Sequence, residues 1–214
     1  MSLPLSPRDG GERYPGFSSV DESDHWDQAT QGAVLVRLGL PPDIRFFTPR
    51  EEAVVRALFD QLLDQHSDPR VPVVNMVDSR LAEAETDGWR YADLPEDGQA
   101  WRETLAALDQ DAVERHGQGF PEVTLDQQAS LLRAVQDLGS KKWHGMTAAR
   151  VWSLWTRYAC TAFYSHPWAW DEIGFPGPAY PRGYKNLGLD RLEPFEVRDA
   201  RPDQDPAAKA GGDG

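Results

Sequence analysis

Two helix-start motifs constrain the fold of this chain more than any other feature of its sequence. Thr48-Pro49-Arg50-Glu51 places a hydroxyl at the N-cap, a proline at the first helical position and a glutamate that can hydrogen-bond back to the cap. Thr124-Leu125-Asp126-Gln127 repeats this arrangement with glutamine in place of glutamate. Apolar residues follow each motif at helical spacing. The sequence therefore predicts amphipathic helices that begin at these two points.

Apolar periodicity predicts three further helices, over about 72–85, over 98–115 and from about 147 to 163. The last of them carries most of its aromatic residues on one side, so we expect it to be the most buried. Only the run 33–36 outside these stretches suggests a short strand or helix. Because no glycine-rich turn joins a strand to a helix, we expect an all-α fold, a bundle of about five helices.

Composition divides the chain into four segments. Residues 1–45 mix Gly, Pro, Ser and Asp and are expected to form an irregular N-terminal arm. The helical bundle occupies 46–163, and 164–200 is expected to be an extended arm rich in proline, glycine and aromatic residues. Residues 201–214 have nothing large to bury, which predicts a disordered tail.

The overall charge and the single cysteine exclude several classes of function. The chain has 22 basic and 35 acidic residues, and a net charge of −13 repels nucleic-acid phosphates. The lone Cys160 excludes an internal disulfide and a cysteine-based zinc site. Its place on the last predicted helix suggests a buried, unreactive thiol. No apolar run approaches the roughly 18 residues of a membrane span, so we expect no direct membrane span.

Reactive groups do not assemble into a recognisable catalytic motif. The chain lacks a P-loop, a dinucleotide-binding glycine motif and a hydrolase nucleophile elbow. No two histidines have the i, i+4 spacing of a helical metal site, and the acidic residues of 83–126 alternate with arginines as on a solvated surface. We therefore expect no catalytic, cofactor-binding or metal-binding residue. The alternative is a helical metalloenzyme built on loop histidines, namely His25, His66, His116, His144 and His166.

The most informative segment is 143–184, which holds eleven of the 22 aromatic residues. In its second part, 164–184, large rings alternate with prolines and glycines. Proline is excluded from helix interiors and central strands, which predicts an extended, turn-rich arm. Aromatic rings left in water forfeit about 1.5–3 kcal/mol each, so the arm must cover something. It either wraps over its own bundle or docks onto another protein, where Trp, Tyr and Arg are common anchors. A self-associating helical adaptor is a further alternative.

The arm supplies the candidate partner-binding residues. They are Tyr164, His166, Pro167, Trp168, Trp170, Gly174, Phe175, Gly177, Pro178, Tyr180, Pro181, Arg182, Gly183 and Tyr184. The Trp, Phe and Tyr rings from Trp168 onwards are expected to be anchors and Arg182 a polar contact. Gly174, Gly177 and Gly183 allow tight turns.

The same segment resembles a known family, the gluconate 2-dehydrogenase subunit 3 family. The resemblance rests on the pieces Phe163-Tyr164-Ser165-His166-Pro167, Ile173-Gly174-Phe175-Pro176-Gly177-Pro178 and Tyr180-Pro181-Arg182-Gly183-Tyr184. Upstream it is supported by Phe46-Phe47-Thr48, by Ala107-Leu108-Asp109, and by Phe120 followed by the stretch 124–132. It covers about residues 46–185.

The resemblance implies a non-catalytic small subunit of a dehydrogenase that oxidises sugars, sugar acids or polyols. The implied partner is a large FAD-binding flavoprotein of the glucose-methanol-choline oxidoreductase class, often joined by a cytochrome c subunit. The small subunit would hold no cofactor itself and would assist folding and export of the flavoprotein, like a chaperone.

Three departures from the family pattern bear on where the complex works. The chain has no adjacent arginine pair of the kind found in twin-arginine signals, its first 45 residues are extra to the pattern, and 66–72 lacks an expected Gly-Ala turn. As written, the chain is expected to be cytoplasmic. It would be periplasmic or extracytoplasmic if it were carried out with its partner.

Overall fold

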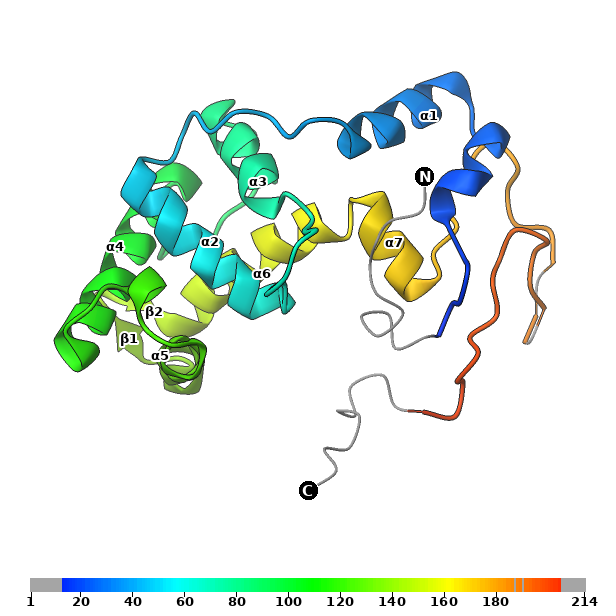
Figure 1. Cartoon of the computed structure of the whole chain (residues 1–214). Helices are drawn as coiled ribbons and strands as arrows, with labels where there is room; N and C mark the ends of the chain where they lie inside the picture. Colours follow the sequence, from blue (N-terminus) through cyan, green and yellow to red (C-terminus); the bar gives the residue numbers. More distant parts are fainter. Residues whose placement is uncertain (1–12, 187, 190, 205–214) are drawn as a thin grey trace. The chain divides into compact units, whose positions relative to one another are not determined.

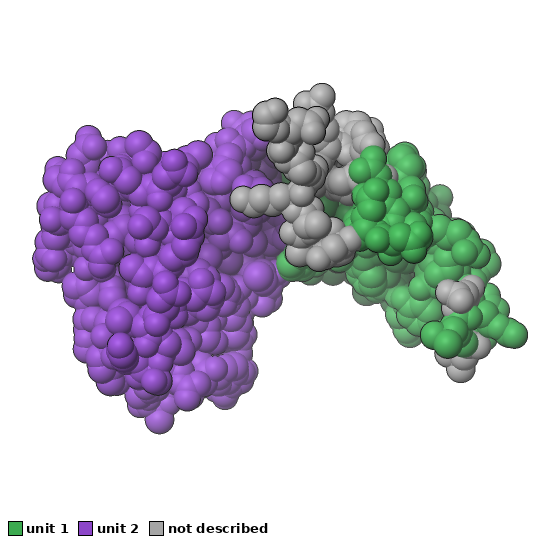
Figure 2. All heavy atoms as spheres, turned by 90° about the horizontal axis from the view of Figure 1, so that it is seen from below, with its two compact units in different colours: residues 1–40, 164–214 green, residues 41–163 purple. Residues whose placement is uncertain are grey.

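The computed structural model describes residues 13–186, 188–189 and 191–204, and it confirms the all-α prediction (Figure 1). The chain forms two compact units, which Figure 2 shows in different colours. Unit 1 comprises residues 1–40 and 164–214, and unit 2 comprises residues 41–163. The two ends of the chain, which the sequence suggested to be separate arms, therefore belong to the same unit.

Unit 2 holds all five of the predicted helices. They are α2 (Pro49–Leu63), α3 (Val73–Ala82), α4 (Asp97–His116), α5 (Leu125–Leu138) and α6 (Ala148–Phe163). Both predicted capping boxes are present, since Thr48 and Thr124 each accept from the backbone N–H three residues on, and the glutamate and glutamine at those positions bond back to the cap. The local helix-start signals thus determine where α2 and α5 begin.

The core of unit 2 is built around α6, which contacts α2, α3 and α5. Trp101 of α4 and Tyr158 of α6 are fully buried and meet edge to face, with ring centroids 5.6 Å apart. The fully buried Trp155 donates its indole N–H to Thr104 Oγ1 over 3.1 Å. Edge-to-face pairs of this kind add about 0.5–1.5 kcal/mol beyond the burial of apolar area.

A buried carboxylate fixes the approach to α2. Asp78 of α3 is completely buried and accepts hydrogen bonds from the backbone N–H groups of Arg45, Phe46 and Phe47, at 2.6–2.9 Å. These three donors lie just before the N-cap of α2, where no helix partner could satisfy them. Asp78 therefore ties the start of unit 2 to α3.

A short antiparallel hairpin in unit 2 was not predicted. It pairs β1 (Lys142–Trp143) with β2 (Met146–Thr147). The turn residues His144 and Gly145 both have positive φ, 45° and 82°, as two-residue hairpins require. Strands of two residues leave no alternating pattern in the sequence, which is why the periodicity did not reveal them.

Unit 1 is more irregular, and its described residues form four short helical elements. These are the 3₁₀-helices η1 (Ser19–His25) and η2 (Val36–Leu38) and the α-helices α1 (Gln28–Leu35) and α7 (Pro167–Ile173). Asp27 caps α1 by accepting from the Thr30 N–H over 2.9 Å. The 33–36 run, which could have been a strand or a helix, is helical.

The prediction that 164–184 is extended throughout is wrong at α7. Pro167 occupies the first helical position, where its missing N–H would have had no partner, and His166 before it has the extended backbone of an N-cap. Gly174 ends the helix in the left-handed conformation, and Pro176 follows beyond that end. The prolines of this segment therefore bound a helix instead of preventing one.

Two remaining expectations concern the tail and the membrane. Most of the predicted disordered tail, residues 205–214, lies outside the described residues. Within the part of the chain that the structure describes, no helix combines the length and the apolar character that crossing a membrane would need.

Candidate functional site

The candidate partner-binding segment has an inner side that packs against the N-terminal segment within unit 1. Trp170 of α7 forms a small buried cluster with Trp26 and Val34. The Trp170 and Trp26 rings meet edge to face at 6.3 Å, and Phe175 packs on Trp170 at 5.3 Å. The Trp170 indole N–H donates to the Tyr164 carbonyl over 2.6 Å. Within unit 1, the Trp170 ring is therefore packed against other rings and its indole N–H is hydrogen-bonded.

Two glycines make this close packing possible. Gly174 and Gly177 have φ values of 68° and 80°, in the left-handed region. A Cβ on Gly174 would lie 2.4 Å from the Tyr14 ring, and one on Gly177 would lie 2.3 Å from the Trp26 ring. Both positions therefore require glycine for the backbone conformation and for the approach of a ring.

Hydrogen bonds join residues 19 and 37 of the N-terminal segment to the segment 165–171 within unit 1. Asp171 accepts from the Ser19 N–H over 2.6 Å, and the Ser19 hydroxyl donates to the Pro167 carbonyl over 3.2 Å. The Arg37 guanidinium donates to the Ser165 carbonyl over 2.5 Å. Burial raises the pKa of Asp171, while its bonds to Ser19 oppose that rise.

His166 is the N-cap of α7 and is 1% exposed. Its Nδ1 accepts from the Trp168 N–H over 3.2 Å, and its Nε2 lies 2.9 Å from the Arg37 carbonyl, so that Nε2 carries the proton and donates. Burial lowers the pKa of His166 to about 4. Both ring nitrogens are therefore engaged in a neutral, structural imidazole.

Arg182 also works inside unit 1. It forms an ion pair with Glu22 at 2.7 Å and donates to the Pro176 carbonyl over 3.2 Å. Its guanidinium also lies 3.7 Å from the centre of the Phe195 ring. A partner contact through Arg182 would have to add to these bonds or replace them.

The predicted segment is thus divided between an inner and an outer side. The buried residues are His166, Pro167, Trp170 and Gly177, and those of intermediate exposure are Trp168, Gly174, Pro178 and Arg182. The exposed residues are Tyr164, Phe175, Tyr180, Pro181, Gly183 and Tyr184. We call the apolar members of this exposed group, together with Ile173 and Leu189, the outer aromatic surface: Tyr164, Ile173, Phe175, Tyr180, Tyr184 and Leu189.

Unit 2 contains a polar group that the sequence analysis did not single out. Asp97, at the start of α4, is 9% exposed and accepts from the Tyr158 hydroxyl over 2.6 Å. Burial, and then the bond to Asp97, raise the pKa of Tyr158, so the phenol stays neutral and donates. The two residues are 61 positions apart, and no local pattern could have paired them. Asp97 lines a pocket of about 460 Å³ that is bounded by residues 81–98.

Two further observations concern the metal ligands considered in the sequence analysis and the single cysteine. Among the described residues, no three His, Cys, Asp or Glu side chains come close enough to hold a metal ion. Cys160 is exposed, so the prediction that it is buried is wrong. Its neighbours Tyr158 and Ala159 face the core, and the next residue along α6 points away from it. Partial burial nonetheless raises the pKa of the thiol and disfavours the reactive thiolate.

Comparison with known proteins agrees with the resemblance found in the sequence. A family model described as gluconate 2-dehydrogenase subunit 3 matches residues 49–177. No curated protein and no solved structure shows significant similarity to the chain. The matched range begins with α2 and runs through α7 to Gly177, which packs on Trp26, and it covers more than half of the chain. The chain belongs to the gluconate 2-dehydrogenase subunit 3 family.

Proposed function

We propose that this chain is the non-catalytic small subunit of an FAD-dependent dehydrogenase that acts on a sugar, a sugar acid or a polyol. Family membership makes it an accessory subunit of a dehydrogenase. The proposed partner is a large flavoprotein of the glucose-methanol-choline class, which would hold the FAD and the catalytic groups. The chain would stabilise that partner in the manner of a chaperone and remain bound to it.

The outer aromatic surface is the observation that carries the proposal. Tyr180 is 66% exposed, Tyr184 51% and Tyr164 49%. Large rings left in water cost free energy that burial against a partner would recover, and tyrosine is enriched among the anchors of protein interfaces. Among the residues of unit 1 that the structure describes, the buried apolar cluster has three members, which is a small core to stabilise the unit.

Co-expression tests the proposal. The chain is expressed with a tag beside a flavoprotein of the glucose-methanol-choline class encoded by a neighbouring gene, and it is purified through the tag. We expect a complex of defined stoichiometry with the absorbance of bound flavin. A colourless monomer would contradict the proposal, and a colourless homo-oligomer in light scattering would favour a self-associating adaptor.

A pair of variants makes the test specific to the outer aromatic surface. Replacing Tyr180 and Tyr184 by alanine is expected to weaken the complex by at least about tenfold, because anchor residues cost more than about 1 kcal/mol when truncated. Val113→Ala is the matched control, since Val113 is 50% exposed but lies on α4 in unit 2. If the tyrosine variant and Val113→Ala lose the same affinity for the flavoprotein, the interface does not depend on the outer aromatic surface.

A further inference from the structure

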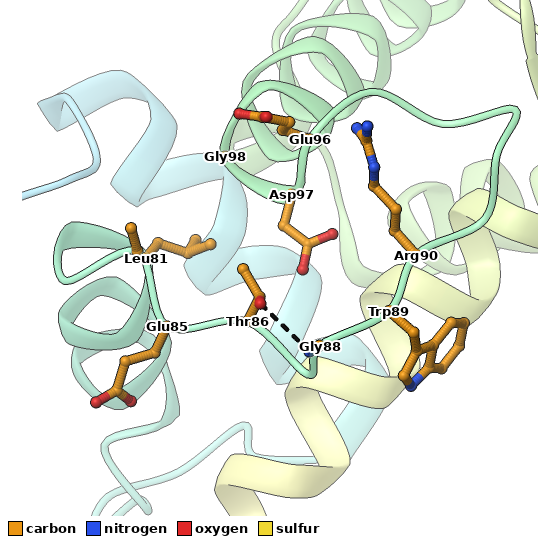
Figure 3. Close-up of a pocket in the computed structure, with 10 residues that line it drawn as sticks. Leu81, Glu85, Thr86, Gly88, Trp89, Arg90, Glu96, Asp97 and Gly98 are labelled. Carbon is orange, nitrogen blue, oxygen red and sulfur yellow. Dashed lines mark hydrogen bonds between the residues drawn. The ribbon is translucent and has the colours of Figure 1, made fainter.

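The pocket beside Asp97 has charged residues in its lining (Figure 3). It lies within unit 2, between the end of α3, the loop that follows and the start of α4, and its volume is about 460 Å³. Its apolar wall comes from Leu81 and Ala84, and the backbones of Gly88 and Gly98 also line it. This size is in the range of pockets that hold small molecules or single side chains.

Asp97 is the only charged residue of the pocket lining that is buried. Figure 3 shows its carboxylate pointing into the space between the loop and α4, while the Glu85 side chain points away. Oδ2 accepts from the Tyr158 hydroxyl, which is a neutral donor. Among the described residues no ion pair involves Asp97. A buried carboxylate is normally paired with a cation, so this one is left with an unmet demand for positive charge.

The nearby arginines do not meet this demand, because they are paired with another carboxylate. Arg80 and Arg157 both form ion pairs with Asp87 of the same loop. Each guanidinium also lies over the Tyr158 ring, at 5.0 and 5.2 Å from its centre. Both guanidinium groups therefore interact with the Asp87 carboxylate and the Tyr158 ring, and neither forms an ion pair with Asp97.

The charge of the lining selects the class of ligand. Besides the buried Asp97, the lining contains two exposed carboxylates, Glu85 and Glu96, and one cation, Arg90, which gives it a formal net charge of −2. An anion would meet the buried Asp97 carboxylate, and the positive end of the α4 dipole is already offset by that side chain in the first turn. A neutral ligand would leave Asp97 uncompensated. A cation with hydrogen-bond donors satisfies both the charge and the free lone pairs.

We infer that this pocket binds a guanidinium or ammonium group carried on a short apolar stem, with Asp97 as its counter-ion. The planar fork of a guanidinium matches a carboxylate in a bidentate pair, which favours it over an ammonium. The stem would lie along the wall formed by Leu81 and Ala84. The inference goes beyond the proposed function, since it assigns a ligand class to unit 2.

Titration with two matched probes tests the inference. N-acetyl-arginine methylamide carries the guanidinium, and the corresponding citrulline derivative has nearly the same shape but no charge. Binding to the full chain is followed by NMR, with the backbone amides of Gly88 and Gly98 as reporters because both residues line the pocket. We expect the arginine probe to shift these amides and to bind at least about tenfold more tightly than the citrulline probe.

Two variants locate the counter-ion. Asp97→Asn keeps the shape and an acceptor for the Tyr158 hydroxyl, and it should remove the preference for arginine. Glu96→Gln changes an exposed carboxylate of the same lining and should alter the affinity by less than about threefold, because exposed charges are screened. If the Asp97 variant does not fold, the two probes on the unaltered chain and on the Glu96 variant decide the matter. Equal affinity for both probes, or an unchanged preference in folded Asp97→Asn, would overturn the inference.

A second arm of the experiment identifies the source of the cation, and this arm alone rests on the proposed function. The titration is repeated on the complex with the flavoprotein. Exclusion of the arginine probe from the complex assigns the cation to a basic side chain of the partner. Unchanged binding assigns it to a free ligand. Either result leaves the pocket a cation site, whereas no binding to the isolated chain at any accessible concentration contradicts it.

Discussion

The two units of the molecule reach stability in different ways. Of the twelve largest fully buried side chains among the described residues, eleven lie in unit 2 and only His166 lies in unit 1. Unit 2 is a helical bundle with a continuous aromatic core, whereas unit 1 combines a cluster of three apolar residues with hydrogen bonds between two distant parts of the chain. From this contrast we predict that unit 2 is the more stable of the two, and that unit 1 would gain more stability from the partner proposed above.

The largest expected effect comes from the core of unit 2. Trp101→Ala should lower the free energy of unfolding of unit 2 by about 3–5 kcal/mol, because a fully buried tryptophan leaves a cavity that cannot collapse. Trp170→Ala is the corresponding change in unit 1. Hydrogen exchange resolved along the chain should show loss of protection in unit 1 alone for that variant. Loss of protection throughout α2–α6 in Trp170→Ala would show that the units do not unfold separately.

Acid should also reveal a difference in stability between the two units. The pKa of His166 is about 4 in the folded protein, against 6.5 for a free histidine side chain. As the pH falls, His166 in the unfolded chain therefore binds a proton before His166 in the folded unit does. The stability of unit 1 is therefore complete above about pH 6.5 and decreases toward pH 4, by roughly 3 kcal/mol in total.

A variant isolates this histidine from other titrating groups. The raised pKa of Asp171 acts in the opposite sense, favouring the folded unit at low pH and losing that contribution as the carboxyl ionises. His166→Gln should abolish the decrease between pH 6.5 and 4, as measured by exchange of the Trp170 indole N–H, which bonds to Tyr164. A decrease of equal size in the variant would rule out His166 as its origin.

A comparison of two glycines of the C-terminal segment, Gly177 and Gly183, should show a smaller effect on stability. Gly177 and Gly183 both have positive φ, but only at Gly177 would a Cβ meet a ring, since nothing lies within 4 Å of a Cβ at Gly183. Gly183→Ala should cost unit 1 about 1 kcal/mol from backbone strain. Gly177→Ala should cost about 2–3 kcal/mol because Trp26 must also move. Chemical denaturation, monitored by hydrogen exchange, measures the loss of stability in each variant. Equal losses would show that Trp26 does not constrain this turn.

The smallest effect is expected at a helix end of unit 2. Thr124→Ala removes the cap of α5, where the Thr124 hydroxyl accepts from the Gln127 N–H over 3.3 Å. The expected cost is about 1 kcal/mol, confined to unit 2. Thr124→Ser retains the acceptor and should restore most of the stability in urea denaturation. A loss in the serine variant as large as in the alanine variant would assign the effect to the methyl group instead.

Sequence reasoning succeeded where the determining interactions are local. The capping boxes at Thr48 and Thr124 and the apolar stripes behind them involve residues three or four apart, and they predicted α2 and α5. Apolar periodicity over the same short distances predicted the other three helices of unit 2. The same reasoning missed α7, because it applied the exclusion of proline from helix interiors to Pro167 and Pro176, which lie at the first position and beyond the end.

The candidate sites depend on contacts between residues far apart in the sequence, so they could be predicted only in part. The sequence showed that the rings of 164–184 need cover, but not that Trp170 is covered by Trp26 while Tyr180 stays exposed. The Asp97–Tyr158 pair joins residues 61 positions apart, and Asp97 looked like one acidic residue among many. Cys160 was misplaced because one step along a helix, about 100°, separates the buried side of α6 from the exposed one.

The assembly of unit 1 from both ends of the chain has a consequence for synthesis on the ribosome. Residues 13–38 are translated before unit 2, yet Trp26 can contact Trp170 and Gly177 only after the whole of 41–163 has been translated. Unit 2 can fold in that interval, because domains generally fold as units during translation. Until α7 has been translated, the Trp26 indole therefore lacks the Trp170 ring that packs on it in the folded unit.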